Sequence, residues 1–218
     1  MKKFLVLGVL FILPLVAYLF FASGVHNFAK LPVLQQSIGT LEPFESLSKS
    51  PVTFTDKITI LGFPGNQLKN RQGNAFNLNQ KIYKKNHDFH DFQMVMVLPY
   101  GSETASKELL EELNAIADVA EWKFLFGTPE QVKTLFKSLK TPFSLDTNLG
   151  SDYVFIIDKD SNLRGRDEDK STQEKKVYGY DASSVPDLAD TMTDDVKVIL
   201  AEYRLALKKY KADRKENY

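Results

Sequence analysis

Two histidines, His87 and His90, are the residues best suited to metal chemistry in this chain. They stand three apart in the polar stretch 86–91, with Asp88 and Asp91 beside them. On a helix, this spacing puts both imidazoles on one face, where a surface zinc or copper(II) ion could bind. The alternative is a polar loop before a strand. We favour the loop, because such an ion usually takes about three or four protein ligands.

Arg164 and Arg166 are the candidate anion contacts. They alternate with Leu163 and Gly165 on a short strand, so both guanidinium groups face the same side and could clamp a carboxylate or a phosphate. They could equally pair with the acids at 167–169. We favour this second interpretation, since exposed ion pairs on strands are common.

The remaining motifs point away from catalysis. The chain has no cysteine, which excludes disulfides, thiolate metal sites and thiol chemistry. Residues Asp158–Asn162 echo the start of a calcium loop, but Leu163 stands where that loop needs glycine. No phosphate-binding loop and no nucleophile motif is present. The sequence therefore predicts a protein that is not an enzyme and has no cofactor.

Composition narrows the class of protein further. The 218 residues include 28 acidic and 28 basic ones, so no net charge suggests binding to nucleic acid. A chain of this length fits one ordinary domain with appendages.

The N-terminus carries a membrane signal. Lys2 and Lys3 precede an uncharged apolar run over residues 4–22. As a helix this run is about 28 Å long, close to the thickness of a bilayer core, and it exceeds the roughly 7–15 apolar residues of a signal peptide. We therefore predict an uncleaved anchor over residues 1–23, although 22–24 would serve as a cleavage site. The two lysines predict that the N-terminus is in the cytoplasm and the rest of the chain outside, which is the periplasm if the cell is Gram-negative.

Strand and helix patterns alternate after a predicted stalk at residues 24–51. Continuous apolar strands are expected near 58–63, 92–98, 122–126 and 152–158, with helices near 73–85, 102–117 and 128–139 and a hairpin return at 163–166. Thr128, Pro129 and Gln131 form a capping-box signature. This order predicts a thioredoxin-like three-layer α/β sandwich over residues 52–180, with parallel first strands.

A charged loop is expected at 167–177 and a helical extension over 181–218. The extension carries one apolar stripe, and we expect this stripe to pack on the domain or on a partner. Three lysines near its end could meet anionic lipid, but a solvated helix end is favoured. The stripe consists of Val196, Ile199, Leu200, Tyr203, Leu207 and Tyr210, and the lysines are Lys208, Lys209 and Lys211.

Several stretches together resemble the Sco/SenC family of membrane-anchored thioredoxin-fold proteins. These are the anchor, the Ile-Leu-Gly-Phe strand 60–63 running into a turn, Glu121–Gly127 with its Trp-x-Phe-Leu-x-Gly pattern, the Pro-Glu-Gln helix start at 129–131, and Tyr153–Asp158. The resemblance implies the thioredoxin-like fold and a role in assisting the delivery of copper to cytochrome oxidase.

The family's ligands are missing from the matching positions. Its C-x-x-x-C pair falls near Asn66 and Asn70, which form a degenerate redox turn, and its histidine falls within residues 146–150, where none stands. Neutral amides cannot replace thiolates as ligands of copper(I).

Three functional hypotheses follow. We favour a binding or assembly module without redox or copper chemistry, with a protein partner in the membrane or envelope. The second is a metal-binding or oxidoreductase-type protein that uses His87 and His90. The third is a structural envelope protein.

Overall fold

The computed structural model describes residues 2–22, 30–167 and 176–216. Its helical elements are α1 (Lys2–Ala22), η1 (Leu68–Arg71), α2 (Gln72–Leu78), η2 (Asn79–Tyr83), α3 (Lys84–Asn86), α4 (Glu103–Asn114), α5 (Pro129–Ser138), η3 (Asp187–Met192) and α6 (Thr193–Glu216). Its strands are β1 (Val33–Gln35), β2 (Glu45–Ser46), β3 (Ile58–Gly62), β4 (Phe92–Pro99), β5 (Trp122–Gly127), β6 (Tyr153–Ile157), β7 (Leu163–Arg164) and β8 (Tyr180–Asp181).

One mixed sheet organises the domain, in the order β1-β7-β6-β3-β4-β5-β2, with β8 added to β6. The strands β3, β4 and β5 run parallel, whereas β6 pairs antiparallel with β3, and β7 with β6. Helical crossovers after β3 and β4 account for the parallel part, and a hairpin accounts for the antiparallel part. The thioredoxin-like α/β prediction is confirmed.

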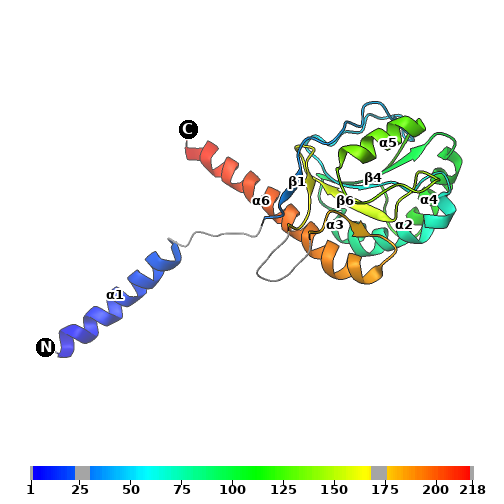
Figure 1. The fold of residues 1–218 in the computed structure, drawn as a ribbon. Coiled ribbons are helices and arrows are strands. Elements are labelled where there is room, and N and C mark those ends of the chain that lie inside the picture. The colour runs from blue at the N-terminus through cyan, green and yellow to red at the C-terminus, as the bar shows by residue number, and fades with distance from the viewer. Residues whose placement is uncertain (1, 23–29, 168–175, 217–218) are drawn as a thin grey trace.

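Helices cover both faces of this sheet (Figure 1). Successive side chains of the central strands point to opposite faces, so Ile60 and Met94 belong to one core while Leu61 and Val95 belong to the other. The first core is closed by α2, α4, η3 and the first half of α6, and the second by α5. Burial on both faces explains why these strands are apolar throughout.

The predicted capping box of α5 is present. The Thr128 hydroxyl accepts from the Gln131 backbone N–H, and the Gln131 side chain accepts from the Thr128 N–H. The start of α4 is different: Ser102 occupies the N-cap position, but its hydroxyl is buried and makes no hydrogen bond among the described residues.

The predicted stalk at 24–51 is wrong for most of its length. β1 pairs with β7 and β2 pairs with β5, which places this segment along both edges of the sheet. Three of its side chains are buried in the domain, Leu31, Ile38 and Leu41. Residues 24–29 of the predicted stalk, and 168–175 of the predicted charged loop, lie outside the described residues.

The C-terminal extension begins inside the domain. Val196, Ile199 and Leu200 are buried against the sheet, as the stripe predicts. The later turns of α6 project away from the domain (Figure 1). The side chains of Leu207, Tyr210 and the predicted lysine cluster lie outside the described part of the structure.

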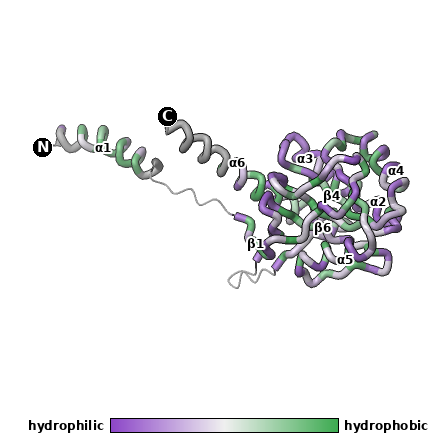
Figure 2. Tube along the Cα trace, turned by 90° about the horizontal axis from the view of Figure 1, so that it is seen from above, coloured by the Kyte–Doolittle hydropathy of each residue, from purple (hydrophilic) through white to green (hydrophobic). Residues whose placement is uncertain are grey.

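α1 lies apart from the α/β domain (Figure 1), and its apolar character contrasts with the polar outer loops of the domain (Figure 2). Of the residues described, none form a helix that combines the length and the apolarity needed to cross a membrane.

Candidate functional site

The turn after β3 lies against the loop that precedes β6. The two segments form an antiparallel bridge between Pro64 and Gly150, and the Asn66 N–H donates to the Asn148 carbonyl over 2.9 Å. Gly65 sits at a φ of 78°, and a Cβ there would lie 2.6 Å from the Asn148 carbonyl oxygen. Only glycine suits both the backbone conformation and this close approach.

Arg71 fills the space between these two segments. Its guanidinium donates to Asp146 and to Asp152, each over 2.9 Å, and reaches the Pro64 carbonyl over 3.4 Å. Asn74 adds a second donor to Asp152 at 2.9 Å. The Arg71 side chain is only 15% exposed, whereas Asp146 is 38% and Asp152 is 46% exposed, so the guanidinium is enclosed while its two acids still reach solvent.

Asp146 also shapes the loop backbone. Its second carboxylate oxygen accepts from the N–H groups of Asn148 and Gly150, each over 2.8 Å. Burial alone raises the pKa of Asp146, but hydrogen bonds from Gly150, Arg71 and Asn148 outweigh it and leave that pKa below its ordinary value. The same loop holds Leu149 at a φ of 61°, in the left-handed region that non-glycine residues rarely adopt.

A small cavity of about 20 Å³ lies beneath the turn, which is room for a single water molecule. Arg71 and Asp152 line it at one side, and Trp122, 3% exposed, lines it from β5. The indole N–H of Trp122 has no hydrogen-bond partner among the described residues. The space suits a buried water better than an organic ligand.

Asn66 and Asn70, which stand where the Sco/SenC resemblance puts cysteines, are exposed on this turn. The Asn70 amide donates to the Gln67 side chain over 2.7 Å. The polar groups gathered beneath them are a guanidinium, two carboxylates and an amide, and none of these is a soft sulfur ligand. This donor set does not fit copper(I).

The histidines lie at the opposite end of β4 from this turn. His87 Nδ1 is 3.5 Å from an Asp88 carboxylate oxygen, and the His90 backbone carbonyl accepts from Lys57 over 2.6 Å. Across the described part of the chain, no group of three or more His, Asp or Glu residues could hold a metal ion. The proposed metal site is therefore not supported beyond its two histidines.

Arg164 and Arg166 both pair with acids of this chain. Arg164, 4% exposed, donates to Asp158 over 3.0 Å, to Glu202 over 2.6 Å and to the Leu31 carbonyl over 2.7 Å. Arg166 binds the Asp195 carboxylate at 2.9 Å.

Both predicted anion contacts are thus balanced within the chain, by Asp158 and Glu202 for Arg164 and by Asp195 for Arg166. Of the favoured partners at 167–169, Asp167 pairs with Lys176 at 3.3 Å, and the other two lie outside the described residues. Arg164 is not a surface residue as predicted: it is buried, and a buried guanidinium must have its charge balanced nearby.

The sequence predicted only part of this candidate site. The resemblance marked the turn and the 146–150 loop, but it gave no role to Arg71, Asp146 or Asp152. An aspartate two residues before an asparagine is a local signal for such a turn. The pairing with Arg71, far away in sequence, has no local signal.

Comparison with solved structures agrees with this fold. A Sco-family protein, described with a disulfide switch as a member of a family of cytochrome c oxidase assembly proteins, matches 78% of this chain and 96% of its own at 13% identity and a TM-score of 0.53. A SCO1/SenC family lipoprotein from Bacillus anthracis str. Ames matches 84% and 99% at 16% identity and a TM-score of 0.51. An Aquifex aeolicus VF5 protein described as a putative electron transfer protein matches 78% and 92% at 14% identity and a TM-score of 0.50.

No protein-family model and no curated protein matches the sequence. At these identities the likeness establishes a shared thioredoxin-type fold. The chain thus has a thioredoxin-type fold similar to that of these proteins, and its sequence contains no cysteine.

Proposed function

We propose that this protein is a partner-binding module on a thioredoxin-type scaffold, working without thiol or copper chemistry. The observation that carries the proposal is the Arg71 cluster. At the edge of the sheet where the resemblance places a redox and metal site, the guanidinium joins the turn to the loop through Asp146 and Asp152. This ion-pair cluster stabilises the shape of the edge, and among the described residues it contains no thiol and no thiolate ligand.

The partner belongs to the membrane or the cell envelope, and the role is an accessory one in assembly. What supports this is the fold shared with a member of the Sco family of cytochrome c oxidase assembly proteins. The apolar run 4–22 holds the protein at the membrane, with its N-terminus in the cytoplasm and its domain outside. A membrane location also agrees with the description of the Bacillus anthracis protein as a lipoprotein.

Site-specific photocrosslinking in intact cells tests this function. A photoreactive residue is placed at Asn66 on the turn and, as a second exposed position, at Glu111 on α4. Membranes are then washed with alkaline carbonate, solubilised and analysed for adducts. We expect the protein to stay with the membrane and to capture one envelope protein, with oxidase subunits or their assembly factors as the specific expectation.

Release of the protein by carbonate would refute the anchor. The absence of a defined adduct from every exposed position, Asn66 and Glu111 included, would refute the binding role and favour a purely structural envelope protein. Separately, stoichiometric copper(I) binding by the purified protein would refute the claim that the site lacks copper chemistry.

A further inference from the structure

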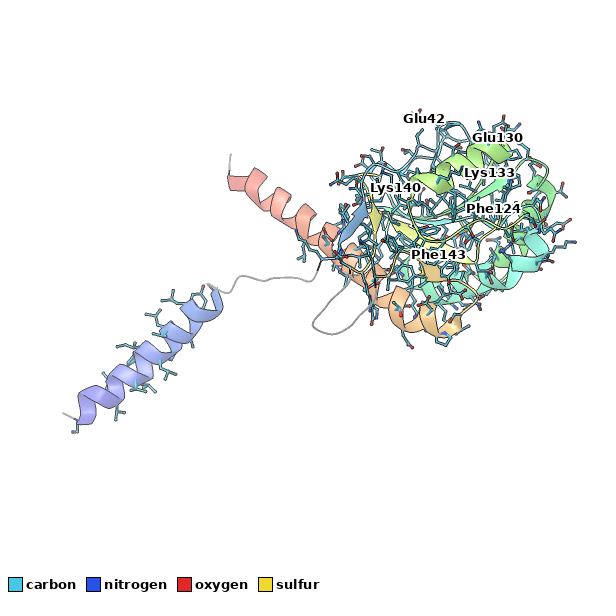
Figure 3. The ribbon with its side chains drawn as sticks, viewed as in Figure 1. Glu42, Phe124, Glu130, Lys133, Lys140 and Phe143 are labelled. Atoms are coloured by element: carbon cyan, nitrogen blue, oxygen red, sulfur yellow. The ribbon has the colours of Figure 1, made fainter. Side chains whose placement is uncertain are left out.

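A groove lies beside the Arg71 cluster, between α5 and the loop that precedes β6. It encloses about 300 Å³, at the small end of the range for ligand pockets. Figure 3 marks Lys133 on α5 and Phe143 on the loop side. The groove is lined by Lys133, Phe136, Lys137, Phe143, Ser144, Leu145, Asp146 and Leu149.

The floor of the groove is apolar and firmly supported. Phe136 is 6% exposed and packs in the core beneath α5. Phe143 stacks on Tyr153, with ring centroids 3.7 Å apart and planes inclined by 16°. Leu149 is held in its left-handed conformation by the loop hydrogen bonds to Asp146. This floor is formed before any partner arrives, which lowers the entropic cost of binding.

The rim of the groove is positively charged. Lys133 and Lys137 stand one helical turn apart on α5 and both line the groove. Neither makes an ion pair with any residue that the structure describes. The acid in the lining, Asp146, has one oxygen on Arg71 and the other on backbone N–H groups, so it forms no ion pair with either lysine.

We propose that this groove is the docking site for an acidic peptide segment of the protein partner, one that inserts a large apolar side chain between its carboxylates. The apolar floor takes the anchor residue, and Lys133 and Lys137 pair with the flanking acids. This inference rests on the proposed binding function and assigns its surface: the α5 side of the sheet edge, next to the turn at Asn66.

The positions of Lys133 and Lys137 also have a purely structural explanation. Lysines near the C-terminal end of a helix interact favourably with its dipole, and α5 ends at Ser138. That effect stabilises the helix but selects no ligand. The two explanations therefore differ in whether reversing the lysine charges changes binding of an acidic peptide.

The test is a selection from a random peptide library displayed on phage, performed on the full-length protein in detergent. The K133E/K137E variant serves for counter-selection. K107E is the matched control, because Lys107 is an exposed lysine on α4, on the other face of the sheet. Enriched peptides are synthesised with a fluorophore, and their affinity is measured by fluorescence anisotropy.

We expect enriched sequences that combine acidic residues with an aromatic or branched aliphatic residue. K133E/K137E should weaken their binding by about tenfold or more, L145A should weaken it about fivefold, and K107E should change it less than about twofold. Higher salt should weaken binding to the parent and, because it screens the repulsion from the two introduced glutamates, strengthen residual binding to the double variant. Circular dichroism confirms that each variant folds.

Three results would overturn the proposal: no enriched peptide, enriched peptides without an excess of acids, or equal binding to the parent and to K133E/K137E. Photocrosslinking distinguishes a wrong assignment of the groove from a wrong assignment of the binding function. Adducts in cells at Asn66 or Glu111 but not at Ser144, which lines the groove, would retain the function and discard the groove. Adducts at Ser144 that disappear in K133E/K137E and persist in K107E would support both.

Discussion

Replacing Arg164 with methionine is the sharpest test of how the two ends of the chain are fixed to the domain. Its guanidinium donates to Asp158 on the β6–β7 turn, to Glu202 on α6 and to the Leu31 carbonyl near the N-terminus. Methionine fills a similar volume without the charge. The variant therefore removes three charge-assisted hydrogen bonds and leaves a carboxylate buried.

The expected loss follows from the burial of the acids that remain. Asp158 is 1% exposed, and breaking a buried ion pair costs about 3–5 kcal/mol. Backbone N–H groups of Asp160 and Asn162 still bind Asp158, and Glu202 is 20% exposed, so both acids keep some stabilisation. We therefore expect the lower end, about 3 kcal/mol, which lowers Tm by about 6–12 °C for a chain of this size.

Urea unfolding followed by fluorescence of the single tryptophan, Trp122, measures this loss. K197M is the control, because Lys197 pairs with Asp194 at a site where both side chains are more than half exposed, and it should change the unfolding free energy by less than about 0.5 kcal/mol. The double variant R164M/D158N removes the uncompensated charge and should recover part of the loss. A loss in R164M no larger than that in K197M would refute the reasoning.

Three further predictions concern Asp146, Tyr203 and Thr128. The lowered pKa of Asp146 means that its contribution to stability is present above its unfolded pKa and is lost as pH falls below about 4, so D146N should flatten the acid limb of a stability–pH curve. Burial and the nearby Asp158 raise the pKa of Tyr203 to about 12. The contribution of Tyr203 is therefore present below about pH 10 and lost as pH rises toward 12, and Y203F should reduce the alkaline loss measured in urea. T128A removes the cap of α5 and should cost about 1 kcal/mol in the same assay, whereas no loss would mean that water replaces the cap.

The sequence predicted what depends on neighbours in the chain. Apolar strands of five or more residues and the capping box at Thr128 carry their own periodic or local signal, and both are present in the structure. The edge strands β1 and β2 contain only three and two residues, too few for a period, so the segment before Ser50 was predicted as a stalk.

The burial of Arg164 depends on contacts with residues distant in sequence. Its partners Leu31 and Glu202 are separated from it by 133 and 38 positions, and no window of sequence shows them together. The ion pairs of the candidate site were not predicted for the same reason, because Arg71 and Asp146 are 75 positions apart in the sequence. Sequence spacing shows which arginines lie on one face of a strand, but it does not show what covers that face.

The two parts of the proposed surface are connected through Asp146. One of its oxygens holds Arg71, and the other holds the backbone of the loop that forms a wall of the groove. A loop with Leu149 in the left-handed region is strained, and such strain persists only where the surroundings fix the backbone. The ion-pair cluster supplies that constraint. In the function proposed above, the polar groups at the edge where the resemblance places a redox site act on binding through the shape of the neighbouring groove, and the charge that selects a partner comes from Lys133 and Lys137 on α5.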